Sequence, residues 1–213
     1  MVALSPSLTK ETMDLACRAL ARKDRALAGV YRAQGAPPLW GRPPGFRTLI
    51  QIVLEQQVSL ASGRATLRRI ETSFGRVSAR RLAEAGEAGL RGVGVTRQKS
   101  RYCRLLAEAS LAGELNLRSV ARATDHDAMA SLTLFKGIGR WTAEVYLLMA
   151  LRRPDVWPAG DLALAKAVQA VKKLPDRPGE DAMRTIAAPW QPYRAVAARL
   201  LWQDYLSRGR RRS

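Results

Sequence analysis

The residues best suited to chemistry lie within residues 134–164, where two glycines precede one helical pattern and an aspartate precedes another. Gly137, Ile138 and Gly139 predict a tight turn, because a glycine without a Cβ lets the backbone bend and approach another molecule. The apolar spacing that follows predicts a helix over residues 140–151. The first amides of a helix have no partner inside it and lie at the positive end of its dipole. The turn therefore predicts a seat for a phosphate oxygen.

Asp161 follows the turn Trp157–Gly160 and opens the next apolar helical pattern, so its carboxylate is expected beside the free amides of that helix. Each feature has a simpler interpretation, since glycine pairs often end helices and an aspartate at a helix start is often only an N-cap. Taken together, a phosphate seat and a carboxylate joined by one short helix suit work on a nucleic-acid backbone and its sugar.

Three segments carry a family resemblance. KGIGRWTAE resembles the hairpin of the helix-hairpin-helix DNA glycosylases, and PAGDLAL resembles their Gly/Pro-rich loop that ends in the catalytic aspartate. PWQPYRAVAARLLW resembles their C-terminal signature, and the DNA-3-methyladenine glycosylase II branch is the nearest in pattern. The resemblance covers residues 39–206, and it implies that Asp161 supports departure of a damaged base from its deoxyribose.

Trp141 stands where the bifunctional members of this superfamily carry a lysine in the hairpin helix. A tryptophan cannot form a Schiff base with the sugar, so that covalent route is closed. The resemblance therefore implies a monofunctional glycosylase without lyase activity.

The resemblance also implies further site residues. The base pocket is expected to include Trp141, Val145, Trp202, Gln56 and Gln57, and DNA contacts are expected from Gly137, Ile138, Gly139, Arg140, Thr142, Gly94, Arg97 and Lys99. The side chain that fills the gap left by an extruded base is expected from residues 95–97, with Arg97 at the aligned position. Simpler alternatives remain for several of these: polar surface for the glutamines, core packing for Trp202, and a solvated basic face around Arg97.

The composition favours binding to a polyanion. The 213 residues include 36 Lys and Arg against 18 Asp and Glu, a net charge of +18. Charge alone does not choose DNA over RNA, the ribosome or a membrane surface. Cys17 and Cys103 are expected to be small core residues, and two cysteines cannot hold a four-cysteine iron–sulfur cluster. His126 lacks the companions of a metal site and is expected on the surface, so neither a metal nor a cofactor is predicted.

The patterns predict an all-α protein of roughly ten helices, without a useful alternating strand pattern. One helix is expected over residues 8–27, a loop over 34–46, and a helix over 60–74 with Ser59 as its N-cap. The resemblance implies the two-lobed helix-hairpin-helix glycosylase fold with a central cleft, lacking the extra N-terminal strand-rich domain of larger members. One lobe is expected from residues 1–45 and 162–213, and the other, with hairpin and catalytic loop, from 46–161.

The expected function is that of a monofunctional DNA glycosylase, which hydrolyses the N-glycosidic bond of alkylated purines such as 3-methyladenine and 7-methylguanine in base excision repair. The alternatives are a glycosylase for another damaged base and a noncatalytic duplex-DNA-binding module. The expected partner is double-stranded DNA containing a damaged base, with no membrane association. We expect a monomer located in the cytoplasm, associated with a bacterial nucleoid, since neither an apolar signal core nor a membrane-spanning run occurs in the sequence.

Overall fold

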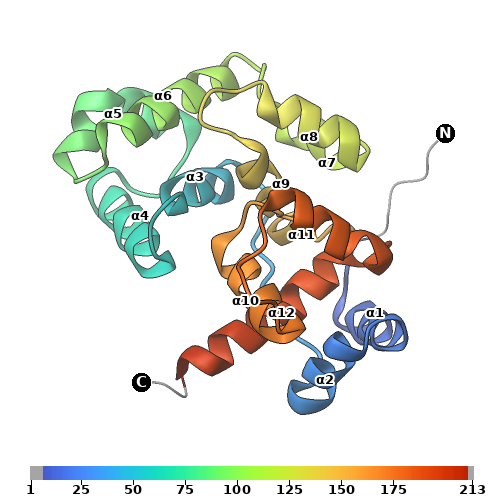
Figure 1. Ribbon diagram of the computed structural model, residues 1–213. Helices are drawn as coiled ribbons and strands as arrows, with labels where there is room; N and C mark the ends of the chain where they lie inside the picture. The colour runs from blue at the N-terminus through green and yellow to red at the C-terminus, as the bar shows by residue number, and fades with distance from the viewer. Residues whose placement is uncertain (1–6, 211–213) are drawn as a thin grey trace. The chain divides into compact units, whose positions relative to one another are not determined.

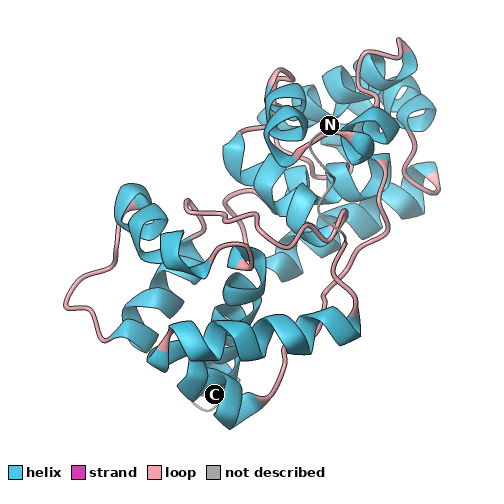
Figure 2. Ribbon diagram, turned by 90° about the vertical axis from the view of Figure 1, so that its right-hand side faces the viewer, coloured by secondary structure: helices cyan, strands magenta, loops and turns pink. Residues whose placement is uncertain are grey.

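The computed structural model describes residues 7–210, which contain helices and loops and no strand (Figure 2). Twelve α-helices and one short 3-10 helix occur in this part of the chain, so the all-α prediction is confirmed. None of these helices is both long and apolar enough to cross a membrane. The described chain divides into two compact units, residues 42–146 and residues 7–41 with 147–210.

The division corrects the expected lobe boundaries. The structure divides the chain between Gly41 and Arg42 and again between Tyr146 and Leu147, which lie within one helix. The loop that ends in Asp161 therefore belongs to the second unit, whereas the sequence analysis grouped it with the hairpin.

The first unit contains α3 (Phe46–Glu55), α4 (Leu60–Phe74), α5 (Ala79–Gly92), α6 (Arg97–Leu111), α7 (Leu117–Arg122), α8 (Asp125–Thr133) and the start of α9 (Arg140–Met149). Helices α5 and α6 pack along each other, and α3 packs against both α4 and α6 (Figure 1). The buried face of α3 includes Leu49, Ile50, Val53 and Leu54, while Phe46 is only half-buried.

The turn between α3 and α4 is held by a buried carboxylate. Glu55 is 4% exposed, and it accepts hydrogen bonds from Arg42 Nη1 at 2.8 Å and from Gln51 Nε2 at 3.0 Å. Gly63 lets α4 pass close to this side chain, because a Cβ there would lie 2.6 Å from Glu55 Cγ. Ser59 accepts a hydrogen bond from the amide of Ser62 at 3.1 Å, which confirms the predicted N-cap of α4.

The second unit contains α1 (Lys10–Lys23), α2 (Arg25–Gln34), α10 (Leu162–Lys172), α11 (Glu180–Ala187), η1 (Ala188–Trp190) and α12 (Arg194–Arg210). The single helix expected over residues 8–27 is wrong, because the chain breaks at Asp24. This residue ends α1 in extended backbone and caps α2, accepting from the amides of Ala26 at 2.9 Å and Leu27 at 3.2 Å. An aspartate between two apolar runs was the available signal.

A buried arginine ties three segments of the second unit together. Arg199 on α12 is fully buried and donates to the carbonyl oxygens of Leu39 at 2.9 Å, Leu148 at 2.6 Å and Ala195 at 3.0 Å. Burial lowers the pKa of its guanidinium to about 10. These bonds join the loop after α2 and the end of α9 to α12, the helix that also carries Trp202.

Candidate active site and nucleic-acid interface

The hairpin of the first unit is a turn between α8 and α9 that only glycine accommodates at its centre. Gly137 has φ +98°, and a Cβ there would lie 2.6 Å from Tyr102 Cγ. The amide of Ile138 donates to the carbonyl of Phe135 at 3.0 Å, and the Ile138 side chain is 2% exposed. The side chain of Ile138 therefore anchors the turn, which leaves its backbone as the part suited to the predicted DNA contact.

Gly139 and the first residues of α9 are the residues predicted to seat a phosphate. The carbonyl of Gly139 accepts the amide of Ala143 at 3.1 Å, so α9 begins here with its first amides directed away from the helix. No atom lies within 4 Å of a Cβ placed on Gly139, and the residue is exposed. Arg140 has a side chain that is 64% exposed and donates through Nε to Glu144 at 2.9 Å. An open backbone beside a cation is the arrangement that a phosphate group requires.

Gln56 supports this hairpin from α3. Its Nε2 atom donates to the carbonyl of Gly137 and to the hydroxyl of Thr142, both at 2.8 Å. Thr142, predicted to contact DNA, is 2% exposed, so its hydroxyl belongs to the support of the hairpin. Gln57, the other glutamine predicted for the base pocket, is exposed and has φ +55°, an uncommon value for a residue other than glycine. The two glutamines thus have different environments, with Gln56 facing the hairpin.

The turn between α5 and α6 is the second predicted DNA contact. Gly94 has φ +83°, and Arg69 from α4 donates to the neighbouring carbonyl of Val93 at 2.8 Å. Val95 is 4% exposed, which removes it from the candidates for the residue that fills the gap in the duplex, and leaves Thr96 and Arg97 exposed. Thr96 caps α6 by accepting the amide of Lys99 at 3.4 Å. Arg97, the first residue of α6, therefore remains an exposed candidate for that role.

Lys99 was predicted to bind DNA, but the structure places its ammonium group against the end of α3. Lys99 Nζ donates to the carbonyl oxygens of Leu54 and Gln56, both at 2.8 Å. Burial lowers the pKa of this ammonium group. The sequence held no signal for this contact, since 43 or more residues separate Lys99 from its partners.

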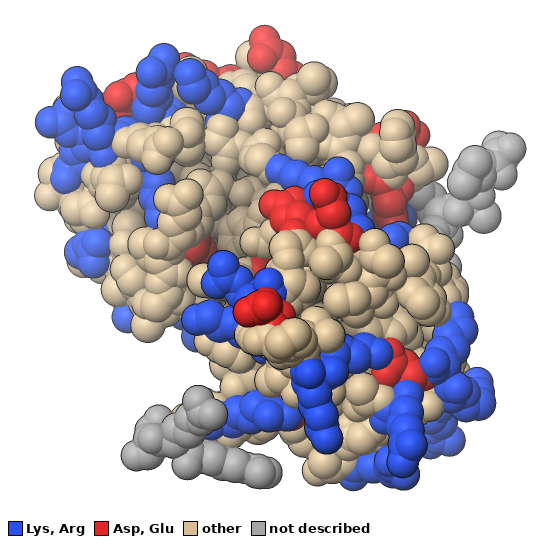
Figure 3. Space-filling view, viewed as in Figure 1, with Lys and Arg blue, Asp and Glu red and all other residues tan. Residues whose placement is uncertain are grey.

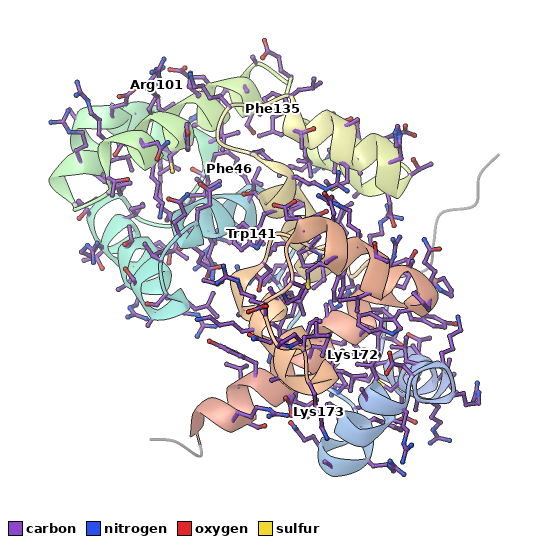
Figure 4. All side chains as sticks on the ribbon, viewed as in Figure 1. Phe46, Arg101, Phe135, Trp141, Lys172 and Lys173 are labelled. Atoms are coloured by element: carbon purple, nitrogen blue, oxygen red, sulfur yellow. The ribbon has the colours of Figure 1, made fainter. Side chains whose placement is uncertain are left out.

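Trp141 and Val145, the two pocket candidates of the hairpin helix, lie one turn apart on α9. Trp141 is half-buried in the first turn of α9 (Figure 4), and Val145 is 5% exposed. No lysine occurs in α9, whose sequence is RWTAEVYLLM. The covalent chemistry that a lysine at this position would supply is therefore closed on this helix.

The carboxylate of the second unit lies at the N-terminus of α10, as predicted. The amide of Asp161 donates to the carbonyl of Pro158 at 3.0 Å, which shapes the turn that precedes the helix. Asp161 Oδ1 accepts two hydrogen bonds, from the amide of Leu164 at 2.7 Å and from Trp202 Nε1 at 3.2 Å. The N-cap prediction is confirmed. Trp202 is 9% exposed and holds the carboxylate through its indole N–H, a role that its predicted place in the base pocket did not include.

An aromatic cluster behind the loop was not foreseen. The rings of Trp157 and Trp190 meet edge to face with centroids 5.4 Å apart. Trp190 Nε1 donates to Asp24 Oδ2 at 2.8 Å, and Lys172 donates to the same oxygen at 2.5 Å (Figure 4 labels Lys172). Burial opposes the charge of Asp24, but the hydrogen bonds from Lys172, Trp190 and Leu27 outweigh it, and the pKa of Asp24 is lowered. Trp157, the first residue of the turn that precedes Asp161, packs in this cluster.

The positive charge is spread over each unit. Lysine and arginine side chains gather on the first unit around α5 and α6, at the upper left of Figure 3, and on the second unit around α1 and α2. The exposed arginines of α5 and α6 are Arg80, Arg81, Arg91, Arg97 and Arg101. His126, whose side chain is 92% exposed, lies on the surface as predicted. Cys17 and Cys103 are buried as predicted, and burial raises the pKa of each thiol to about 12.

Comparison with known proteins identifies the family. The chain is 26% identical over 191 residues to the putative DNA-3-methyladenine glycosylase YfjP of Bacillus subtilis, covering 84% of this chain and 65% of that protein. It is 26% identical over 188 residues to DNA-3-methyladenine glycosylase 2 of Escherichia coli, covering 83% and 64%. The chain thus spans a little less than two thirds of the length of these two curated relatives.

A solved structure agrees with the sequence matches. The fold is similar to that of the Schizosaccharomyces pombe 3-methyladenine DNA glycosylase Mag1 in complex with abasic DNA, with a TM-score of 0.76 and 25% identity over 88% of this chain and 95% of that one. Residues 50–192, which include both the hairpin and Asp161, match the family model of the HhH-GPD superfamily base excision DNA repair proteins. The resemblance seen in the sequence is confirmed, and the chain belongs to the HhH-GPD superfamily.

Proposed function

We propose that this protein is a monofunctional DNA glycosylase that hydrolyses the N-glycosidic bond of alkylated purines, such as 3-methyladenine and 7-methylguanine, in base excision repair. The observation that carries the proposal is the carboxylate of Asp161, held through Oδ1 by the amide of Leu164 and the indole of Trp202. The names of the relatives support the substrate class, because they are 3-methyladenine glycosylases.

The chemistry requires little beyond one carboxylate. A base must leave the stack before its glycosidic bond can be reached. The positively charged base of an N-alkylated purine is already a good leaving group, so strong acid assistance is unnecessary. The sugar develops oxocarbenium character, which an anionic Asp161 stabilises, and the same carboxylate orients or deprotonates the attacking water. No cofactor is needed for these steps.

In this proposal the hairpin binds the backbone of the DNA duplex. The backbone amides at the start of α9 bind a phosphate of the duplex, and exposed cations such as Arg97 and Arg140 add attraction that does not depend on base sequence. Electron-rich rings favour a cationic base by cation–π attraction, on the order of 0.5–2 kcal/mol per contact. Trp141 and Trp202 are the candidates for such contacts.

The decisive experiment offers the purified protein a series of duplexes, each with one defined lesion, and measures abasic sites. Asp161→Asn is the test variant, because asparagine keeps an Oδ1 that accepts from Leu164 and Trp202 while it removes the charge. We expect DNA binding to persist and single-turnover excision to fall by roughly 10²–10³-fold or more. Asp176→Asn, the same change at an exposed residue after α10, is the matched control.

Two results would contradict the proposal. Excision of 3-methyladenine by Asp161→Asn at a rate close to that of the unmodified protein would remove the catalytic assignment. Release of no base from any lesion, with duplex binding intact, would favour the noncatalytic DNA-binding module. The absence of lyase activity is tested separately by borohydride trapping, in which a covalent protein–DNA adduct would mean that an amine acts as nucleophile despite Trp141.

A further inference from the structure

Lys99 occupies the carboxyl end of α3 in the first unit. Its Nζ atom donates at 2.8 Å to the carbonyl oxygen of Leu54 and at 2.8 Å to that of Gln56. The last carbonyls of a helix lack partners inside it and lie at the negative end of its dipole, so an ammonium group there both satisfies them and complements the dipole. Two of the three N–H groups of Lys99 are thus used on backbone oxygens.

The residue whose carbonyl Lys99 binds is the one whose side chain holds the hairpin. Gln56 ends α3, and its Nε2 donates to the carbonyl of Gly137 and the hydroxyl of Thr142, both at 2.8 Å. The backbone of Gln56 must be fixed for its side chain to reach both acceptors. The hydrogen bonds from Lys99 Nζ to the carbonyl oxygens of Leu54 and Gln56 hold that backbone in place.

A second contact from the same helix reaches the hairpin directly. Tyr102, three residues after Lys99, lies so close to Gly137 that a Cβ on the glycine would be 2.6 Å from Tyr102 Cγ and 2.7 Å from Tyr102 Cβ. Residues three apart on a helix share a face. Gln98 Nε2 donates to the Tyr102 hydroxyl at 2.9 Å, which fixes the ring. One face of α6 therefore supports the hairpin through Tyr102 and, by way of Gln56, through Lys99.

We propose that Lys99 is a positioning residue for the phosphate-binding hairpin, acting through Gln56, and that it does not bind a DNA phosphate itself. The proposal rests on the proposed function for its consequence in DNA binding, but its structural part concerns the first unit alone. To reach a phosphate, the ammonium group would have to break its hydrogen bonds to two carbonyl oxygens, and the end of α3 would then lose its cap. The face of α6 that holds the hairpin is thus separate from the exposed cations of the same helix, such as Arg97 and Arg101.

The test compares Lys99→Met, Gln56→Met and the double variant, with Arg101→Met as a charge-matched control on an exposed side chain of α6. Hydrogen exchange of peptides covering residues 134–146 is measured first, because it reports opening of the hairpin without DNA. We expect exchange to increase about 10-fold in each single variant, as for the loss of one charge-assisted or amide hydrogen bond. The exchange rate of the double variant should be close to that of either single variant, since both changes break the same chain of contacts from Lys99 through Gln56 to the hairpin. Arg101→Met should exchange as the unmodified protein does.

Affinity for an undamaged duplex is then measured from low to high salt. Because Lys99 does not contact phosphate, its loss should weaken binding about 10-fold at every salt concentration and leave the slope of log Kd against log salt unchanged. A direct phosphate contact would instead reduce the slope by about one, with hairpin exchange unaltered. That result, or additive effects in the double variant, would overturn the proposal. If Lys99→Met does not fold, Gln56→Met must still show the faster hairpin exchange. If the protein releases no base, the exchange measurement still decides the role of Lys99.

Discussion

Replacing Gly137 with alanine is expected to destabilise the protein, whereas the same change at Gly139, two residues away, is not. At Gly137 an added Cβ would lie 2.6 Å from Tyr102 Cγ and 2.7 Å from Tyr102 Cβ. These are the atoms nearest the backbone of the tyrosine, so rotation of the ring cannot move them away. The φ of +98° adds conformational strain for any residue with a side chain.

The size of the effect follows from these two terms. A positive φ costs roughly 1–2 kcal/mol for a residue other than glycine, and overpacking typically costs about 1–3 kcal/mol. Their sum, about 2–5 kcal/mol, lowers the Tm of a chain of this size by roughly 5–15 °C. Gly139 has no atom within 4 Å of its added Cβ, so its variant should stay within about 0.5 kcal/mol of the unmodified protein.

Thermal unfolding and duplex affinity together check this prediction. Gly139→Ala should have the same Tm as the unmodified protein. Its affinity for undamaged and for damaged duplex should fall by the same factor, because a phosphate contact carries no base information. Tyr102→Ala should recover only a small part of the stability lost in Gly137→Ala, because it removes the contact with Cγ but leaves both the 2.7 Å contact with the Cβ of residue 102 and the backbone strain. A Gly137→Ala protein with an unchanged Tm would refute the role given to Tyr102 and to the positive φ.

Two further predictions concern the second unit. Trp202→Phe keeps an aromatic ring but removes the N–H that donates to Asp161. Single-turnover base excision should therefore fall about 10-fold with duplex affinity unchanged. Equal excision rates for this variant and the unmodified protein would show that the indole hydrogen bond does not orient the carboxylate. Asp24→Asn should cost about 3 kcal/mol of unfolding free energy at neutral pH, because it breaks a buried pair with Lys172. The pKa of Asp24 is lowered in the folded state, so its stabilisation is present above the ordinary aspartate value of 3.8 and is lost as the pH falls below it. Urea unfolding at pH 7 and pH 3 should therefore show a penalty that shrinks in acid, and a penalty independent of pH would contradict the ion pair.

Local patterns predicted the all-α class and some of the helix starts, although they missed the break at Asp24. Ser59 was recognisable as an N-cap from its position before an apolar run, and it accepts the expected amide bond. Asn116 and Thr124 cap α7 and α8 in the same way, accepting the amides of Ser119 and Asp127. Such signals depend on neighbours in the chain, and they are therefore visible in a single sequence.

The support of the site could not be predicted in the same way. Lys99 and Gln56 were both assigned to a DNA or base contact, because a lysine at a helix start and a glutamine before a turn are equally compatible with binding and with internal bonds. Their actual partners are set by how α3, α6 and the hairpin pack, which no spacing along the chain encodes. Arg199 shows the same limit, since its fully buried guanidinium serves three carbonyls and nothing in its helical pattern marks it as buried.

The two interpretations of Asp161 offered by its sequence, an N-cap and a catalytic carboxylate, are joined by the structure. The amide of Leu164 and the indole of Trp202 both donate to Oδ1, so the bond that caps α10 also fixes the direction of the carboxylate. Neither of these two partners carries a formal charge, so these bonds orient the carboxylate without neutralising it. Their N–H dipoles point at the oxygen, as does the positive end of α10. A carboxylate held in this way needs no reorganisation when positive charge develops on a sugar, which is the condition for electrostatic stabilisation. Capping the helix is thus the means by which the fold keeps Asp161 ready for the proposed reaction.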